Sequence, residues 1–334
     1  MVVEVLSSSG EGYVSAFECS LGSSGEFDPL MCLPNLLTLE QQEVKREYYR
    51  SFPECLKNLD AYRNGCDALK GYGCKITDWP DYAILKSQCE EIPTLLEPCK
   101  KFQKVSRGPQ HVFGEKELAE YSYNRSQGAE IAGSYVWVPG SEEAELMIFM
   151  QRPKLLYIQQ LKKSVAFHSS HVVCLASTND APKEKQCEVY WGDAKGTLVM
   201  EGGLVQKGHK QRLYKRTLVD AEGRFFTQLH IDYWFDHDCK PDLDVLLEAF
   251  KLVEELECKT PLHIHCAAGI NRTGAFAVLY KIWKLLKRNP AATINLPLII
   301  FTLQWQRQYA CYSALKWFHE LIPQMAENIK ANQP

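Results

Sequence analysis

The chain has 334 residues, a formal net charge of −3 and a charged fraction of 24%. This balance excludes the strongly basic surface with which proteins contact nucleic-acid phosphates. The hydrophobic fraction of 46% is ordinary for a chain with a buried core, and the apolar runs are too short or too interrupted to span a membrane. The sequence therefore predicts a folded protein with no transmembrane segment and no nucleic-acid partner.

The thirteen cysteines include no Cys-x-x-Cys pair, so zinc-ribbon spacing is absent and we expect neither a metal nor a cofactor. An odd number of cysteines, in a chain large enough to bury a core, favours reduced thiols over a disulfide framework. The N-terminal stretch MVVEVLSSSGEGYVSAFECS lacks the basic and apolar regions of a cleaved leader. Together these features predict a cytoplasmic protein.

The first part of the chain differs from the rest in composition and hydrophobic pattern. Residues 1–37 are rich in Ser and Gly, which predicts loop or disordered chain, and residues 37–64 show a helical pattern broken at Pro53. We therefore predict an N-terminal extension over 1–100, mainly helical after its disordered start, and a larger domain over 101–330.

Beyond residue 130 the pattern changes to short strands and then to a strand followed by helices. The expected strands lie at 145–150, 171–177, 196–205, 214–220, 224–234 and 261–266. Helices are predicted at 242–257, 273–289 and 312–328, of which 273–289 is apolar nearly all round. This order indicates an α/β or α+β fold in which helices flank a central sheet.

The stretch HIHCAAGINRTG, residues 263–274, carries the strongest chemical signal. A predicted strand ends at Cys266, and a helix begins near Arg272 and Thr273 after a short loop. Backbone N–H groups in such a loop converge at the positive end of a helix dipole, where a phosphate binds and a thiolate is stabilised. Gly269 permits the tight curl, and the guanidinium can hold two phosphate oxygens. The pattern predicts a nucleophilic thiolate facing a bound phosphate.

This stretch resembles the signature loop of the Cys-based protein tyrosine phosphatase family, His-Cys-x5-Arg-Thr-Gly. Further segments resemble the same family in the same order: IAGSYVWVPG, IFMQRP, KQCEVYWG, LYKRTLVDAEGRFFTQLHIDYWFDHD and LQWQRQY. Together they span about residues 125–325. The resemblance implies a divergent member with a twisted mixed sheet flanked by helices, working through a phosphocysteine intermediate.

The resemblance also implies a role for each residue of the loop. Cys266 would attack phosphorus, and Thr273 would donate its hydroxyl to the sulfur and help it leave later. The phosphate would be held by Ala267, Ala268, Gly269, Ile270, Asn271 and Arg272. Asn271 stands where the family usually has Gly, a tolerable change because Asn accepts left-handed backbone angles.

Two segments compete to supply the general acid. DWPDY contains the family's Trp-Pro-Asp trio, but its Asp81 lies 185 residues before Cys266 and outside the resembling segments. YWFDHD follows a predicted strand and places Asp236 30 residues before Cys266, as the family does. We therefore predict that Asp236 acts as acid and then as base, with Asp238 as a rival, and that the trio at Asp81 is a coincidence.

Three further features of the family have more than one candidate. Asp180 or Glu184 would orient the signature arginine, and Tyr121 and Tyr123 either line the pocket or lie on the surface. The family's water-positioning glutamines fall on Tyr312 and Lys316, so the candidates become Gln304, Gln306 and Gln308.

The leading hypothesis is a protein tyrosine phosphatase that acts on phosphotyrosine proteins, and the absence of Lys between Cys266 and Arg272 favours this substrate over charged inositol lipids. One alternative keeps the mechanism with a phosphoinositide or phosphoserine/phosphothreonine substrate. Another is a weakly active module that binds phosphorylated proteins. The extension would select partners, and the divergence suggests a pathogen effector in a host cytosol.

Overall fold

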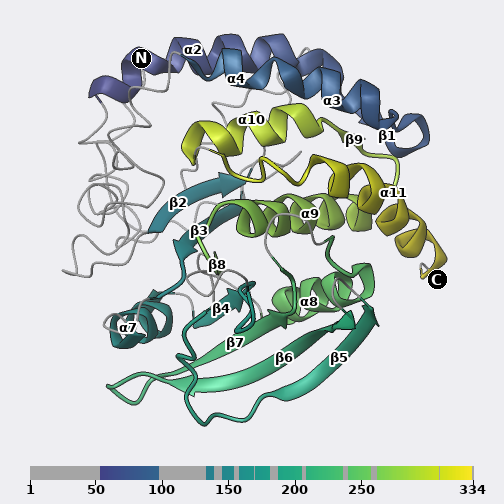
Figure 1. Ribbon diagram of the computed structural model, residues 1–334. Coiled ribbons are helices and arrows are strands. Elements are labelled where there is room, and N and C mark those ends of the chain that lie inside the picture. The colour runs from purple at the N-terminus through teal and green to yellow at the C-terminus, as the bar shows by residue number, and fades with distance from the viewer. Residues whose placement is uncertain are drawn as a thin grey trace, which may run out of the picture.

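Figure 1 shows the computed structural model, in which a twisted sheet is covered by helices on both faces. The structure describes residues 53–97, 133–138, 145–153, 158–168, 170–180, 187–204, 208–235, 240–256, 262–307 and 309–332. Within these ranges, no helix is both long enough and apolar enough to cross a bilayer.

Seven strands form the central sheet in the order β2-β3-β8-β4-β7-β6-β5. Their bounds are β2 Gly133–Val138, β3 Glu145–Gln151, β4 His171–Cys174, β5 Thr197–Leu204, β6 Lys210–Val219, β7 Phe225–Asp232 and β8 Leu262–Cys266. The inner strands β3, β8, β4 and β7 run parallel, whereas β2, β6 and β5 pair antiparallel with their neighbours. The predicted α/β class with a mixed sheet is confirmed, and β8 lies in the middle of its parallel part.

Helices cover the two faces of the sheet unequally (Figure 1). One face packs against α8 Leu243–Glu255, α9 Asn271–Arg288, α10 Leu296–Gln306 and α11 Leu315–Ala331, and the other packs against α7 Ile158–His168. The first thirteen residues of α9, from Asn271 to Trp283, are all buried. The prediction of a central buried helix after the strand that ends at Cys266 is therefore confirmed.

Helix α8 shows how the sequence sets an element's limits. Its apolar residues recur at helical spacing, and seven of its thirteen residues are buried. Asp242 caps its start, because the Asp242 carboxylate accepts a hydrogen bond of 3.1 Å from the Val245 N–H. The same carboxylate accepts 2.8 Å from the Gly203 N–H, which ties the helix to β5.

The N-terminal helices lie across α10 and α11 as an outer layer (Figure 1). This layer holds α2 Pro53–Leu69, α3 Tyr82–Glu90 and α4 Ile92–Leu95, with the short helices η2 Lys70–Tyr72 and η3 Ile76–Asp78. Strand β1, Cys74–Lys75, pairs antiparallel with β9, Thr293–Ile294. Helix α2 begins at Pro53, where the sequence predicted a break, and runs beyond the predicted end at residue 64.

The outer layer shares one apolar core with the helices beneath it. The Tyr62 ring stacks on Phe301 with ring centroids 5.7 Å apart, and its hydroxyl lies 3.2 Å from the Thr302 hydroxyl. A Cβ at Gly65 would stand 2.2 Å from the Phe301 ring, so only glycine allows this approach. Residues 53–97 thus pack on the same body as the sheet, and the division at residue 100 stays a prediction.

Candidate active site

Cys266 is the last residue of β8, at the carboxyl end of the parallel part of the sheet. Ligand sites in α/β proteins gather at this edge. Residues 266–272, here called the signature loop, lead into α9, which starts at Asn271. Gly269 has a φ of 64°, the left-handed conformation that glycine adopts without strain. The predicted strand, loop and helix are therefore confirmed around Cys266, which is 2% exposed.

Asn271 is not left-handed, so the reason given for its tolerance does not apply, and the tolerance itself stays a prediction. Among the described residues, the non-glycine residues with positive φ are Ser170, Tyr233, Tyr309 and Cys311. Asn271 is instead the first residue of α9, and its side-chain oxygen accepts a hydrogen bond of 3.1 Å from the Ser313 N–H. The side chain thus ties the signature loop to the turn before α11.

The Arg272 guanidinium is fully buried and is held at two of its nitrogens. Nη1 donates to the Trp234 carbonyl at 2.6 Å, and Nη2 pairs with the buried Asp180 carboxylate at 2.8 Å. Of the two acidic candidates, Asp180 makes this contact, whereas Glu184 lies outside the described residues. A planar guanidinium held in this way keeps a fixed orientation, and the carboxylate balances its buried charge.

Arg307, which directly follows α10, is a buried side chain that the sequence reasoning missed. Its Nε donates to the Gly269 carbonyl at 2.7 Å, and its Nη2 donates to the Ala268 carbonyl at 3.2 Å. In a trans peptide the N–H points opposite to the C=O, so these bonds turn the following N–H groups to the other side of the loop. The QR pair in LQWQRQY was the signal that could have found it.

Burial lowers the pKa of the Arg307 guanidinium to about 10, and a negative charge on the nearby Cys266 side chain would oppose this shift. The side chain is therefore still a cation at neutral pH. It adds a positive charge behind the signature loop, where such a charge favours an anion on the other side.

Thr273 is fully buried in the first turn of α9. Its hydroxyl makes no hydrogen bond to any described residue, so the expected bond to the Cys266 sulfur is not formed here. Its help to the leaving sulfur stays a prediction.

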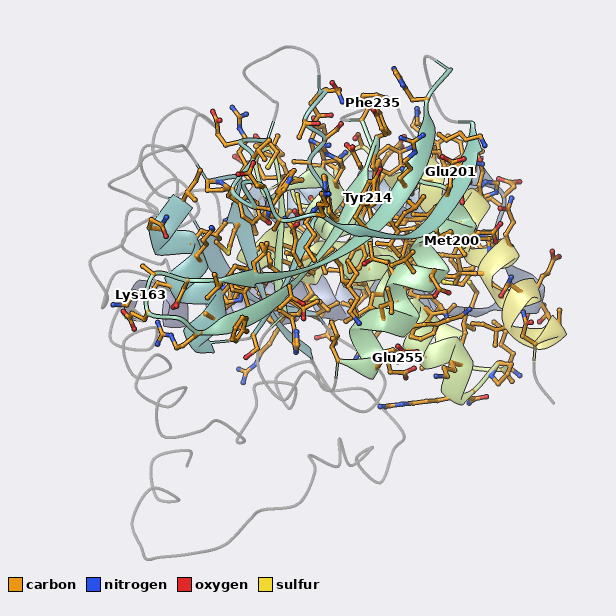
Figure 2. All side chains as sticks on the ribbon, turned by 90° about the horizontal axis from the view of Figure 1, so that it is seen from below. Lys163, Met200, Glu201, Tyr214, Phe235 and Glu255 are labelled. Carbon is orange, nitrogen blue, oxygen red and sulfur yellow. The ribbon has the colours of Figure 1, made fainter. Side chains whose placement is uncertain are left out.

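The segment after β7 leads towards the predicted acid. Trp234 is fully buried, with its ring centroid 6.1 Å from that of Trp317, and Tyr233 has a φ of 61°. Figure 2 labels Phe235 at the end of this segment, far from Lys163, which pairs with Glu222 at the opposite end of β7. Asp236 and Asp238 lie outside the described residues.

Of the candidate pocket tyrosines and water-positioning glutamines, the structure describes only some. Tyr121, Tyr123 and Gln308 lie outside the described residues. The Gln304 amide donates to the Ala310 carbonyl at 3.1 Å, and the Gln306 amide donates to the Thr302 carbonyl at 3.1 Å. Both contacts fasten α10 and the turn after it, and a role for either glutamine at a water stays a prediction.

The family model for protein-tyrosine phosphatase matches residues 124–321, more than half of the chain. The chain belongs to this family. Its matched region includes every strand of the seven-stranded sheet and the whole signature loop.

Three curated relatives are less than a third identical to the chain over the aligned residues. Tyrosine-protein phosphatase 2 of Schizosaccharomyces pombe is 28% identical over 136 residues, covering 37% of this chain and 19% of that protein. Receptor-type tyrosine-protein phosphatase C of Homo sapiens is 22% identical over 229 residues, covering 62% of this chain and 17% of that protein. Tyrosine-protein phosphatase non-receptor type 12 of Homo sapiens is 27% identical over 168 residues, covering 47% of this chain and 22% of that protein. The chain thus matches about a fifth of each relative's length.

Asp81, in the other Trp-Pro-Asp trio, has a structural role. It is the N-cap of α3, and its carboxylate accepts a hydrogen bond of 2.9 Å from the Ile84 N–H. The trio therefore reflects a helix start: the proline precedes the cap, and the cap satisfies an N–H that has no partner within the helix.

Replacing Asp81 by alanine is expected to lower the free energy of unfolding by about 1 kcal/mol, because the capping bond at Ile84 is lost. The value of kcat/KM for a phosphotyrosine peptide should stay unchanged. Urea unfolding and steady-state kinetics measure the two effects, with Asp81→Asn as the conservative variant that keeps the cap. A large fall in kcat/KM for a folded Asp81→Ala protein would return this residue to the candidates for general acid.

Arg307→Lys is expected to lower kcat/KM by about 10- to 100-fold, because a lysine keeps the charge but cannot hold both carbonyls in the guanidinium's fixed geometry. As a positioning residue, Arg307 should also affect inhibition by orthovanadate, which binds where the phosphate would. Weaker vanadate inhibition alongside an unchanged melting temperature is the expected pair of results. Unaltered inhibition would mean that the two bonds to the loop are dispensable.

Proposed function

We propose that this chain hydrolyses phosphotyrosine in proteins. The observation that carries the proposal is the arrangement at the end of β8. There the Cys266 thiol precedes a loop braced by Arg307, and the Arg272 guanidinium is fixed by Asp180 and by the Trp234 carbonyl. A single anion placed over the loop would meet backbone N–H groups, a helix N-terminus and a guanidinium together.

The reaction has two steps. In the first, the Cys266 thiolate attacks phosphorus, an S–P bond forms, the P–O bond to tyrosine breaks, and Asp236 gives its proton to the leaving phenolate. In the second, Asp236 takes a proton from water, which attacks phosphorus and releases the thiolate and inorganic phosphate. Arg272 and the backbone of residues 267–272 bear the charge that develops on the phosphoryl oxygens.

The composition of the loop supports a phosphotyrosine substrate over an inositol lipid. The residues between Cys266 and Arg272 are Ala, Ala, Gly, Ile and Asn, so the loop supplies no cationic side chain for additional phosphates. Cytoplasmic location, action in a host cell and partner selection by residues 1–100 stay predictions.

The test is phosphate release by the full chain from a matched panel of phosphotyrosine peptides, phosphoserine and phosphothreonine peptides, and soluble phosphoinositides. Cys266→Ser serves as the blank. Release from phosphotyrosine peptides alone, absent in the blank, is the expected result. Release mainly from lipids or from phosphoserine would contradict the proposed phosphotyrosine substrate but leave the proposed mechanism unchanged. Phosphopeptide binding by both proteins with no release by either would make the chain a phosphoprotein-binding module.

A further inference from the structure

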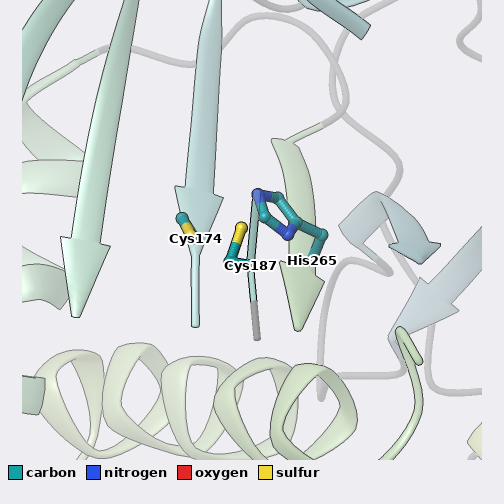
Figure 3. A group of neighbouring side chains, drawn as sticks. All are labelled: Cys174, Cys187 and His265. Carbon is teal, nitrogen blue, oxygen red and sulfur yellow. The ribbon is translucent and has the colours of Figure 1, made fainter. Parts of the chain in front are cut away.

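Two thiols and one imidazole meet on the face of the sheet that α7 covers. Cys174 ends β4, His265 lies on β8, and Cys187 lies in the segment before β5. Cys174 and His265 are register partners on neighbouring parallel strands, so their side chains leave the sheet on the same face. Figure 3 shows the three side chains gathered together, with Cys187 between the other two.

His265 brings two ring nitrogens into the core beside the two cysteines. Its Nε2 lies 2.9 Å from the Tyr190 hydroxyl, whereas its Nδ1 makes no hydrogen bond to any described residue, although the side chain is fully buried. An unpaired ring nitrogen in a protein core is costly, and most such atoms have a partner. A histidine binds a metal through one ring nitrogen. The nitrogen of His265 that faces Cys187 in Figure 3 is the one farther from the main chain, Nε2, so a bound ion would replace the contact with the Tyr190 hydroxyl.

The distances and donor types suit zinc. The ligand atoms of the three side chains lie within 4.8 Å of one another, and both cysteines are thiols, not a disulfide. Two thiolates on tetrahedral zinc, each at about 2.3 Å from the ion, are about 3.8 Å apart. Side-chain movements of about 1 Å or less would therefore close the site. Two sulfurs and one imidazole select zinc over the hard cations magnesium and calcium.

We propose that Cys174, Cys187 and His265 bind a zinc ion, with water as the fourth ligand. Both thiols release their protons to solvent as the two S–Zn bonds form, so two thiolates and one zinc dication add no net charge to the core. The ligands come from three separate segments, which explains why the sequence shows no Cys-x-x-Cys spacing and why no metal was expected from it.

The site lies directly behind the signature loop. His265 precedes Cys266 on β8, and Cys174 and Cys187 flank the segment that carries Asp180, the partner of Arg272. A bound ion would join β4, β8 and the segment before β5 at this edge of the sheet. Zinc would then brace the strand end that carries the thiol without touching the substrate.

The experiment uses cobalt(II) as a spectroscopic substitute for zinc and the full chain with Cys266→Ser, so that the candidate nucleophile cannot bind the metal. The expected result is about one equivalent of cobalt per chain, with a sulfur-to-cobalt charge-transfer band and the visible bands of a tetrahedral site. Cys174→Ser and Cys187→Ser, each added to this parent, should abolish the charge-transfer band. Cys66→Ser is the matched control, since Cys66 and Cys187 are each 4% exposed.

Circular dichroism and thermal unfolding check that each variant is folded. If the added substitutions prevent folding, the test rests on the Cys266→Ser parent alone. The intensity of its charge-transfer band gives the number of thiolates that bind the cobalt. A folded parent without these bands overturns the proposal, as do bands that survive both substitutions. Peptide mapping that finds Cys174 joined to Cys187 in protein purified without reductant would also overturn it. No step measures phosphatase activity, so the zinc site and the proposed function fail independently.

Discussion

Replacing Cys266 by serine is expected to lower kcat for phosphotyrosine hydrolysis by on the order of 10⁵-fold or more. The proposed mechanism needs a thiolate as nucleophile, and a serine hydroxyl in the same place stays protonated and attacks poorly. The fold should survive, because serine is slightly smaller than cysteine and the residue ends a strand held by β3 and β4. Phosphate binding should also survive, since Arg272 and the loop backbone are unchanged. The measurements are kcat and the Kd for a phosphotyrosine peptide.

Cys66→Ser provides the control for this substitution. Cys66 is a buried cysteine of α2, in the outer helical layer, so the same chemical change there should leave kcat within about twofold. If both variants lost activity, destabilisation would be the cause. If Cys266→Ser kept measurable turnover above the rate of a buffer blank, Cys266 would not be the nucleophile.

The chemistry that is contiguous in the chain was predictable from the sequence. Strand, loop and helix around Cys266 follow one another within a dozen residues. The local sequence therefore suffices to predict their order and the glycine in the turn. Helices α8 and α9 were predicted within a few residues because both have long apolar patterns, Asp242 caps the start of α8, and Pro290 follows the end of α9.

Strand ends were less predictable because side chains compete with the sheet for backbone groups. The apolar run at 171–177 predicts a longer strand than β4, which ends at Cys174. The Ser177 hydroxyl accepts from the Asn179 N–H at 3.1 Å and donates to the Asp232 carboxylate at 2.7 Å. These bonds start the turn that carries Asp180 to Arg272.

Contacts between distant parts of the chain could not be read from periodicity. Arg307 contacts carbonyls 38 and 39 residues earlier, and Tyr62 contacts Thr302 across 240 residues. The sequence does not show whether an arginine is buried, and only the fold determines which carbonyls its guanidinium contacts. The same holds for Cys174 and His265, which the sheet register brings together, and for Cys187, which the segment before β5 places beside them.

Replacing Arg272 by lysine is expected to lower kcat/KM by about 10³-fold, although the positive charge is kept. The guanidinium reaches the Trp234 carbonyl and the Asp180 carboxylate at once, and its planar fork can also meet two phosphate oxygens. An ammonium is a single point charge that cannot keep this set of contacts. Most of the loss should appear in kcat, because charge on the phosphoryl oxygens changes most in the transition state.

Arg288→Lys is the matched control, since Arg288 is an exposed arginine in the last turn of the same helix. It should leave kcat/KM and the melting temperature unchanged. Arg272→Lys should also lower the melting temperature, because Asp180 is fully buried and would lose part of its charge pairing. A folded Arg272→Lys protein with kcat/KM within about tenfold of the parent would show that charge alone suffices, and that the fork held by Asp180 is not what binds the phosphoryl group.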